Sequence, residues 1–295
     1  MKKNISFIIT FMSFFTCCFS QGYNEIFNLN TEHAALKTDN IRFKGSRSVA
    51  NILLPIAMDK LKTRYLLIGA NAESINFSEE PNDFSHNRFY GITATLGYIA
   101  QVSIKSKITT ILLPFTNSDF KINEGNHVRF GGIVRWATTV NEAFTWRLTA
   151  GLRQQFFGTQ YILLGGIDWK ANENWRLFGD LPQNFTVAYR LSDGWRVGLS
   201  HLAGLTSYNI TGQSRYFRYN YTYEGLFMEI NMTKNIVLKA NAEYALTRKF
   251  EIYNDKDKPD ATFIFFQFGN KPTPLSKPIE KGISFRLGLS YRVFN

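Results

Sequence analysis

The sequence predicts an all-β protein, a closed, antiparallel, up-and-down β-barrel of about 12 to 14 strands that spans a membrane. Three observations predict it: strands with period-two alternation, connections that alternate between tight and loose, and tryptophans gathered at one set of strand ends. Of the 295 residues, 44% are hydrophobic and 16% aromatic. The mean hydropathy of -0.18 is nevertheless too low for a bundle of membrane helices.

The first twenty residues have the layout of a secretory signal peptide. Two lysines are followed by an apolar run at residues 5–15 and by small or polar residues near Ser20. A single membrane anchor is the alternative, but the run is short of the ~20 residues that a spanning helix needs. We expect cleavage near Ser20, which removes both cysteines, Cys17 and Cys18. The remaining chain divides into an N-terminal segment, residues 21–38, and the barrel, residues 39–295.

The barrel region repeats one pattern, a strand in which apolar residues alternate with polar or small ones. The clearest example ends the chain, where residues 283–293 alternate without an error. Residues 90–103, 144–153 and 236–247 alternate in the same way. Many of these strands exceed the usual five or six residues of a soluble strand. The pattern begins near residue 48 and predicts a sheet with one apolar and one polar face.

The connections between these strands are of two kinds. Tight turns are predicted at residues 60–62, 105–107, 141–143, 171–174, 192–194 and 233–235. Looser, mostly longer links are predicted between them, at residues 78–87, 121–126, 158–160, 180–184, 209–215 and 254–281. An outer-membrane barrel has short periplasmic turns and longer extracellular loops, whereas no rule demands this alternation of a β-sandwich.

Tryptophans and strand parity add to this prediction. Trp146, Trp175 and Trp195 follow short turns and Trp169 precedes one, as in an aromatic girdle at a membrane interface. About thirteen strands are recognisable, but a bacterial single-chain barrel has an even number. Either an extra strand lies near residues 41–44, or the weak pieces around residues 179–183 do not both span, so 12 and 14 strands both stay open.

The end of the chain resembles the C-terminal recognition signal of outer-membrane proteins. Arg286, Gly288, Tyr291 and Val293 occupy its polar, glycine and two hydrophobic positions. One departure is that the chain ends on Asn295, whereas many such proteins end on an aromatic residue. The resemblance implies that the barrel-assembly machinery reads this strand during insertion.

Residues from about 40 to 295 also resemble a family of uncharacterised Gram-negative outer-membrane β-barrels, known only as a domain of unknown function. Three stretches carry the resemblance: LLPIAMD at residues 53–59, LPQNFTVAYRLSDG at 181–194 and YEGLFMEINMTKN at 223–235. The resemblance implies a fold and a location in the bacterial outer membrane. It implies no activity.

If the apolar set of side chains faces lipid, the other set faces the lumen. That set contains ten basic residues: Arg129, Arg135, Arg147, Arg153, Arg190, Arg196, Arg218, Lys239, Arg286 and Arg292. It contains fewer acidic residues: Asp168, Glu224, Glu229 and Glu243. A change of phase through a bulge is expected near Glu224 in the strand at residues 216–232.

Two interpretations of this lumen remain open. In the first, the interior is packed and arginines and carboxylates cross-link the strands, since buried charge demands pairing. In the second, a narrow water-filled passage has a positive lining that favours anions. Part of the charge excess could instead contact lipopolysaccharide phosphates, from Lys256, Lys258, Lys271 and Lys277 in the last long loop. In the same loop the apolar run at residues 261–268 is expected to extend the barrel wall above the membrane, with contact to lipopolysaccharide or to a partner as the alternatives.

No chemistry-bearing motif stands out. None of the four histidines has a second ligand at metal spacing. The string Ser200-His201 invites comparison with barrel enzymes that modify lipids, but no Asn or Asp partner is identifiable. The basic residues form no face with stacking aromatics, which argues against nucleic acid. We therefore predict no catalytic, cofactor-binding or metal-binding residue.

The sequence thus predicts a porin-like outer-membrane barrel that is not an enzyme. It would be a narrow channel or transporter-like barrel, or a structural one, with an arginine-rich lumen and with membrane lipid and lipopolysaccharide as its surroundings. The first alternative is a secreted soluble β-sandwich that binds a ligand. The second is an outer-membrane enzyme that modifies lipids. The solute and the oligomeric state do not follow from the sequence.

Overall fold

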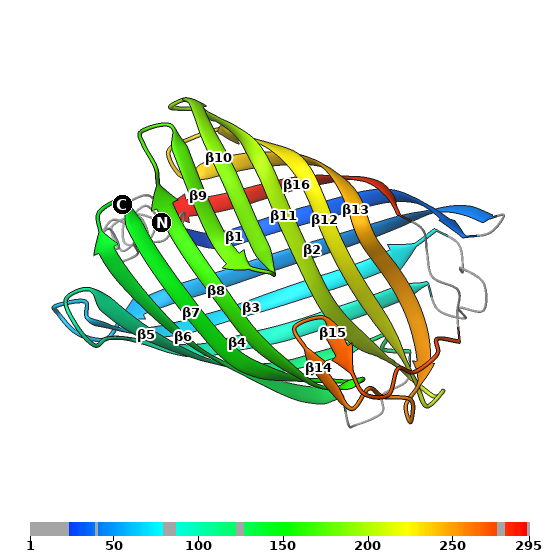
Figure 1. Ribbon diagram of the computed structural model, residues 1–295. Helices are drawn as coiled ribbons and strands as arrows, with labels where there is room; N and C mark the ends of the chain where they lie inside the picture. Colours follow the sequence, from blue (N-terminus) through cyan, green and yellow to red (C-terminus); the bar gives the residue numbers. More distant parts are fainter. Residues whose placement is uncertain (1–23, 39–40, 79–86, 122–126, 276–280, 294–295) are drawn as a thin grey trace, which may run out of the picture.

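The computed structural model describes residues 24–38, 41–78, 87–121, 127–275 and 281–293, which form long strands joined by turns and loops (Figure 1). Fourteen of the sixteen strands form one ring, and the other two, β14 (Ala261–Phe263) and β15 (Phe266–Phe268), form a small hairpin. The ring strands are β1 (Asn24–Thr38), β2 (Ile41–Ala57), β3 (Arg64–Phe77), β4 (Arg88–Gln101), β5 (Ser106–Ser118), β6 (Val128–Asn141), β7 (Phe144–Gln155), β8 (Gly158–Lys170), β9 (Trp175–Leu181), β10 (Asn184–Ser192), β11 (Trp195–Ile210), β12 (Arg215–Asn231), β13 (Ile236–Asn254) and β16 (Gly282–Val293). Among the described residues no helix is long and apolar enough to cross a membrane.

The ring is closed and antiparallel throughout. Its first strand β1 pairs with its last strand β16, from Asn24 opposite Val293 to Ala34 opposite Ser284. Pairing of β8 with β9 joins the two halves of the sheet on the other side. The predicted fold class, a closed up-and-down barrel, is confirmed. Of the two strand numbers that the sequence allowed, 12 and 14, the structure has 14.

The barrel begins earlier than the sequence indicated. β1 occupies most of the segment at residues 21–38 that was set apart from the barrel, and the stretch at residues 41–44 is the beginning of β2. The outward positions of β1 after Leu29 include Thr31, His33 and Ala35, so this strand lacks the continuous apolar alternation that reveals the others. The predicted signal peptide, residues 1–20, lies outside the described residues.

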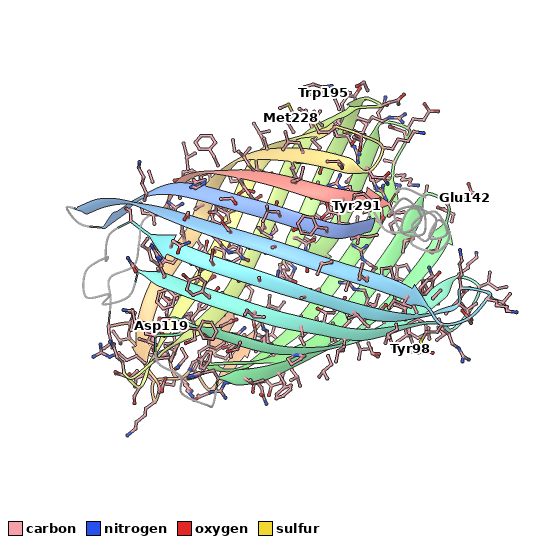
Figure 2. The ribbon with its side chains drawn as sticks, turned by 180° about the vertical axis from the view of Figure 1, so that it is seen from behind. Tyr98, Asp119, Glu142, Trp195, Met228 and Tyr291 are labelled. Atoms are coloured by element: carbon pink, nitrogen blue, oxygen red, sulfur yellow. The ribbon has the colours of Figure 1, made fainter. Side chains whose placement is uncertain are left out.

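The outside of the ring is apolar and the inside is polar. On β16, Phe285 and Leu287 are 62% and 61% exposed, whereas the neighbouring Arg286 lies inside in an ion pair. Large apolar side chains project from the ring in the same way on most strands, for example Met228 and Tyr98 in Figure 2. So many exposed apolar groups on one surface are stable only against lipid, which makes this a transmembrane barrel.

The two ends of the barrel differ in their connections. The links at residues 58–63, 102–105, 142–143, 171–174, 193–194 and 232–235 all lie at one end, here called the short-turn end. Trp195 and Glu142 lie there, and Asp119 lies towards the opposite, long-loop end (Figure 2). The predicted division into short turns and longer loops is therefore confirmed, except that residues 156–157 and 182–183 make two-residue links at the long-loop end.

The wall is incomplete near the long-loop end. β9 and β10 are short, so β8 pairs with β9 only over Gly165–Lys170, and β11 pairs with β10 only up to Leu202. Beyond the tip of this hairpin no ring strand lies between β8 and β11 (Figure 1). There β14 pairs in parallel with the free edge of β8, with Phe263 opposite Tyr161. The hairpin β14–β15 thus extends the wall at this gap.

The long-loop half of β11 leans across the barrel onto β5. Asn209 forms a bridge with Ser118, and the Asn117 side chain donates to the Ser207 carbonyl oxygen at 3.1 Å. Thr211 Oγ1 donates to Asp119 Oδ1 at 2.8 Å. Because five strands separate β5 from β11 in the ring, this contact narrows the lumen at the long-loop end.

The phase change expected near Glu224 does not occur on β12. Its register with β13 does shift, but at Thr222 and Tyr223, and β12 itself keeps its alternation from Phe217 through Glu229. Glu224 therefore points outward, where its carboxylate contacts His201, and it does not line the lumen.

Candidate functional site

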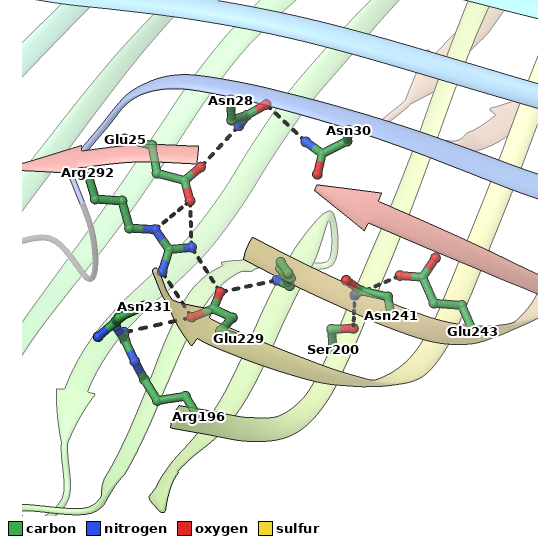
Figure 3. A network of polar contacts seen from close by, with 11 residues as sticks. Glu25, Asn28, Asn30, Arg196, Ser200, Glu229, Asn231, Asn241, Glu243 and Arg292 are labelled. Carbon is green, nitrogen blue, oxygen red and sulfur yellow. Dashed lines mark hydrogen bonds and ion pairs between the residues drawn. The ribbon is translucent and has the colours of Figure 1, made fainter. Parts of the chain in front are cut away.

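Charged side chains cross-link five neighbouring strands inside the short-turn end (Figure 3). Arg292 of β16 donates to Glu25 of β1 through Nε at 2.8 Å, and to Glu229 of β12 through Nη1 and Nη2, both at 2.9 Å. Arg196 and Lys239 each lie 3.8 Å from the Glu229 carboxylate. We call these five residues the short-turn network.

The centre of the short-turn network is deeply buried. Glu229 is 3% exposed and Arg292 is 2% exposed. Ionised groups are retained at such depth only when partners replace their lost hydration. The alternation of each strand puts every member on an inward position, and the ring closure of β1 with β16 brings Glu25 to Arg292.

A second cross-link joins β6, β7 and β9 around Asp180. The carboxylate accepts from Arg135 Nη2 and Arg147 Nε, both at 3.1 Å. Arg147 also donates to the Gly179 carbonyl oxygen at 2.9 Å. A Cβ on Gly166 would lie 2.1 Å from Asp180 Oδ1, so this close approach requires glycine at that position.

Further ion pairs continue around the interior. Two bonds join Arg176 to Asp168, at 2.9 and 3.0 Å. The other pairs are Arg286 with Glu243 at 2.8 Å, Arg286 with Glu32 at 3.6 Å, and Arg47 with Glu73 at 2.5 Å.

Most of the predicted lumen cations thus have a carboxylate partner. The eight with a partner among the described residues are Arg135, Arg147, Arg190, Arg196, Arg218, Lys239, Arg286 and Arg292. Arg190 lies at the rim and is the weakest case, 3.8 Å from a fully exposed Asp193. Arg218 pairs with Glu251 on the side of β12 that faces away from the lumen. The remaining two, Arg129 and Arg153, have no such partner in this part of the chain.

Aromatic side chains fill the long-loop half of the interior. Phe89 of β4 stacks on Phe217 of β12, with ring centroids 4.3 Å apart, and both residues are fully buried. Tyr219 stacks on Phe250 of β13 at 4.6 Å, and Phe77 of β3 meets Phe250 at 5.0 Å. This aromatic cluster joins β3 and β4 on one wall to β12 and β13 on another, and it occupies the region that the lean of β11 has narrowed.

A smaller apolar cluster lies on the other side of the β11–β13 sheet. It contains Phe156, Phe157, Leu205, Tyr216 and Tyr253, and Phe265 of the small hairpin packs against it. The β7–β8 link and the hairpin β14–β15 therefore cover the outward side of strands that have moved into the barrel. Gln160 Nε2 and the Ile264 carbonyl oxygen, 2.5 Å apart, fix the hairpin to β8.

A disulfide is expected to form between β8 and the small hairpin when Tyr161 and Phe263 are both replaced by cysteine. They are Cα partners, and partners in a sheet are close enough for disulfide geometry. Both side chains point outward, so the replacement disturbs little packing. Oxidation should change the mobility of the folded protein on a non-reducing gel.

The matched control pairs Tyr161→Cys with Phe266→Cys. Phe266 lies on β15, one strand further from β8, where the Cα separation is too large for a disulfide. Equal cross-linking of the two pairs would contradict the docking of β14 on β8.

The structure also locates the predicted assembly signal. Arg286 and Gly288 lie inside on β16, Tyr291 lies outside, and Val293 pairs with Asn24. A Cβ on Gly288 would lie 2.2 Å from Asn30 Oδ1, so a larger residue there would displace the Asn30 side chain of β1. Reading of this strand by an assembly machinery stays a prediction.

Several interior residues escaped the sequence analysis. The aromatic cluster was missed because Arg218 was placed in the lumen, with a change of phase expected near Glu224. The signal was present, since Tyr219, Tyr221 and Tyr223 share a parity with Glu229, a residue predicted to lie inside. Glu25, Glu32 and Glu73 were missed because β1 was not recognised and because the partners of an ion pair depend on register.

The string Ser200-His201 does not form a joint site. Ser200 lies inside, beside Asn241, whereas His201 lies outside and is bonded to Glu224 at 2.6 Å and to the Pro182 carbonyl oxygen at 2.8 Å. Successive residues of a strand point to opposite faces, so the serine cannot use this histidine as its base. In the described ranges no three His, Cys, Asp or Glu side chains gather as a metal site.

The fold and its outer surface define a transmembrane β-barrel. The chain belongs to the family described as Domain of unknown function (DUF6268), whose model matches residues 28–269. A comparison with curated proteins gives no match.

Solved barrels resemble it only remotely. An outer-membrane channel of Pseudomonas putida F1 has 7% identity over 92% of this chain and 96% of its own, with a TM-score of 0.44. The P. putida toluene transporter TodX has 10% identity over 93% and 91%, also at 0.44. The NanC porin has 9% identity over 90% and 100%, at 0.39. Similarity at this level carries no information on what this chain binds or conducts.

Proposed function

We propose that this protein is a bacterial outer-membrane barrel, not an enzyme, that provides a narrow passage and is closed at its long-loop end in the state described here. The observation that carries the proposal is the aromatic cluster between facing walls. About eight strands leave an interior that side chains can fill, whereas 16 to 18 leave an aqueous channel. A ring of 14 needs a dedicated closure, and the lean of β11 with the aromatic cluster provides one.

The exposure of inward charged side chains in the short-turn half supports a passage on that side of the closure. Several inward charges keep part of their side-chain surface exposed, 28% for Arg135, 28% for Lys239 and 20% for Arg176. A side chain that points into a closed barrel is exposed only to its lumen. We therefore expect a vestibule at this end, lined with paired charges and with a modest preference for anions.

A purely structural barrel is the second candidate. It is favoured by the short-turn network, which ties together five neighbouring strands. The ion pairs outside that network also favour it, because together they leave most of the basic lining with a carboxylate partner. Conductance separates the two candidates, because only the passage requires a closure that can be opened.

In planar bilayers we expect the wild-type barrel to conduct little and the double variant Phe89→Ala/Phe217→Ala to conduct several-fold more. The two substitutions remove the stacked rings that join β4 to β12 and open the narrowed region. The reversal potential in a salt gradient should indicate a preference for anions.

The matched control is Phe285→Ala, which removes an outward ring from β16 and should leave conductance unchanged. Folding of each variant is checked by its heat-modifiable mobility on gels. A folded double variant as silent as the wild type would favour the structural barrel. Recovery of the native protein from the soluble periplasmic fraction would overturn the outer-membrane location itself.

A further inference from the structure

Two neighbouring arginines of the lumen stand apart from the rest because no carboxylate pairs with them among the described residues. Arg129 lies on β6 and Arg153 on β7, both on inward positions near the long-loop end. Each keeps an intermediate exposure although it points inward, so part of each side chain is open to solvent between β6–β7 and β11. Two cations left uncompensated in an interior that pairs its other charges require an explanation.

The local packing fixes where these two guanidinium groups lie. The Arg153 side chain passes over Gly131, which is the Cα partner of Arg153 on β6. The Cζ atom of Arg153 lies 4.1 Å from the centroid of the Phe115 ring. Arg129 is the Cα partner of Phe115, and its own Cζ lies 4.9 Å from the Phe156 centroid. A ring covers one face of each guanidinium, which leaves the edge, where the N–H donors are, for another group.

Donors without acceptors gather at this place. Arg129 Nε and Arg153 Nε are both buried without a hydrogen-bond partner. The same is true of Nε2 of His127, the residue before β6. Since the Asn209 amide nitrogen can only donate, His127 Nδ1 accepts its bond at 3.1 Å and Nε2 carries the proton. Three buried N–H groups on one inner surface therefore lack an acceptor.

The acidic groups nearby are already engaged. The field of Glu73 reaches Arg153, but its carboxylate is held by Arg47. Asp119 accepts from the Thr211 nitrogen and hydroxyl and from Ser118. This surface thus carries more positive charge than negative charge, and more hydrogen-bond donors than acceptors.

We propose that Arg129, Arg153 and His127 form a binding site for a small oxyanion, a phosphate or a carboxylate, between the inner face of β6 and β7 and the outward face of β11. Only an anion supplies acceptors for the free donors and compensates the charge at the same time. The Phe115 and Phe156 rings hold the two guanidinium groups in place, so that little side-chain freedom is lost on binding. The site depends on this geometry alone and does not require that the barrel conducts.

The test is calorimetric titration of the detergent-solubilised full barrel with inorganic phosphate and, separately, with acetate, at a fixed chloride concentration. We expect a roughly millimolar or tighter dissociation constant for at least one of the two anions. The double variant Arg129→Gln/Arg153→Gln should weaken it by about tenfold or more, since charge-assisted hydrogen bonds are lost. The tighter anion of the two identifies the ligand chemistry.

The matched control is Arg190→Gln, an equal loss of charge at the exposed rim, which should leave binding unchanged. Lack of wild-type binding up to about 50 mM of either anion would overturn the proposal. So would a double variant that binds like the wild type, or an Arg190→Gln variant that loses as much affinity, because the effect would then be one of general charge.

Two single variants keep the test decisive if the double variant does not fold. Arg129→Gln and Arg153→Gln each remove one guanidinium and leave the other in place. Each should lower the affinity for the added anion severalfold, since charge-assisted hydrogen bonds are lost. Unchanged affinity in both single variants would count against the site.

Discussion

Replacement of Glu229 by alanine is expected to lower the free energy of unfolding of the barrel by about 3 to 5 kcal/mol. The carboxylate is 3% exposed and accepts two bonds from Arg292, with Arg196 and Lys239 at 3.8 Å. Without it, Glu25 would be the one carboxylate left in the short-turn network for three cations. Urea-induced unfolding in lipid vesicles, followed by tryptophan fluorescence, measures the loss.

The matched control is Asp193→Ala, which removes a carboxylate of the same end of the barrel. Asp193 is fully exposed and lies 3.8 Å from Arg190. Exposed pairs contribute about 0 to 1 kcal/mol, so this variant should unfold almost like the wild type. Equal losses in the two variants would mean that the short-turn network does not stabilise the barrel through buried pairing.

Replacement of Phe217 by alanine is expected to cost the barrel about 3 to 5 kcal/mol, the usual range for a buried phenylalanine. Its ring is fully buried and packs against Phe89 at 4.3 Å, Tyr208 at 5.6 Å and Phe250 at 5.9 Å. The loss has two parts, the transfer free energy of the ring and the cavity that it leaves. The same unfolding measurement applies.

Phe285→Ala is the informative comparison because Phe285 is 62% exposed on the outer surface of β16. Lipid chains can fill the space of the missing ring, so the cavity part is absent and the loss should be smaller by about 1 to 2 kcal/mol. Equal losses would indicate that the aromatic cluster is loosely packed, and they would weaken the argument that it closes the lumen.

The sequence was sufficient for the fold because strand alternation is a local property. The error-free pattern of β16 and the short turns before Trp146, Trp175 and Trp195 each follow from neighbouring residues. β1 was missed because its outward positions beyond Leu29 are polar or small, and lipid contact selects apolar residues only where lipid is present.

The interior could be predicted only in part, because partners across a sheet depend on register and curvature. Arg292 could be placed inside from its parity, but its bond to Glu25 requires a closed ring. The aromatic cluster requires that β11 leave the cylinder and reach β5, and no local pattern encodes such a lean. Tyr216 and Phe217 are both fully buried for this reason, because both faces of β12 are covered there.

Closure of the ring has a consequence for the kinetics of folding and unfolding. Glu25 and Arg292 are separated by 267 positions in the chain, so their bond forms only when the last strand meets the first. An open precursor, with β16 not yet paired to β1, does not contain it. Interactions that appear after the transition state slow unfolding and leave the folding rate almost unchanged. The bond between Glu25 and Arg292 is therefore expected to prolong the lifetime of the inserted barrel without accelerating its formation.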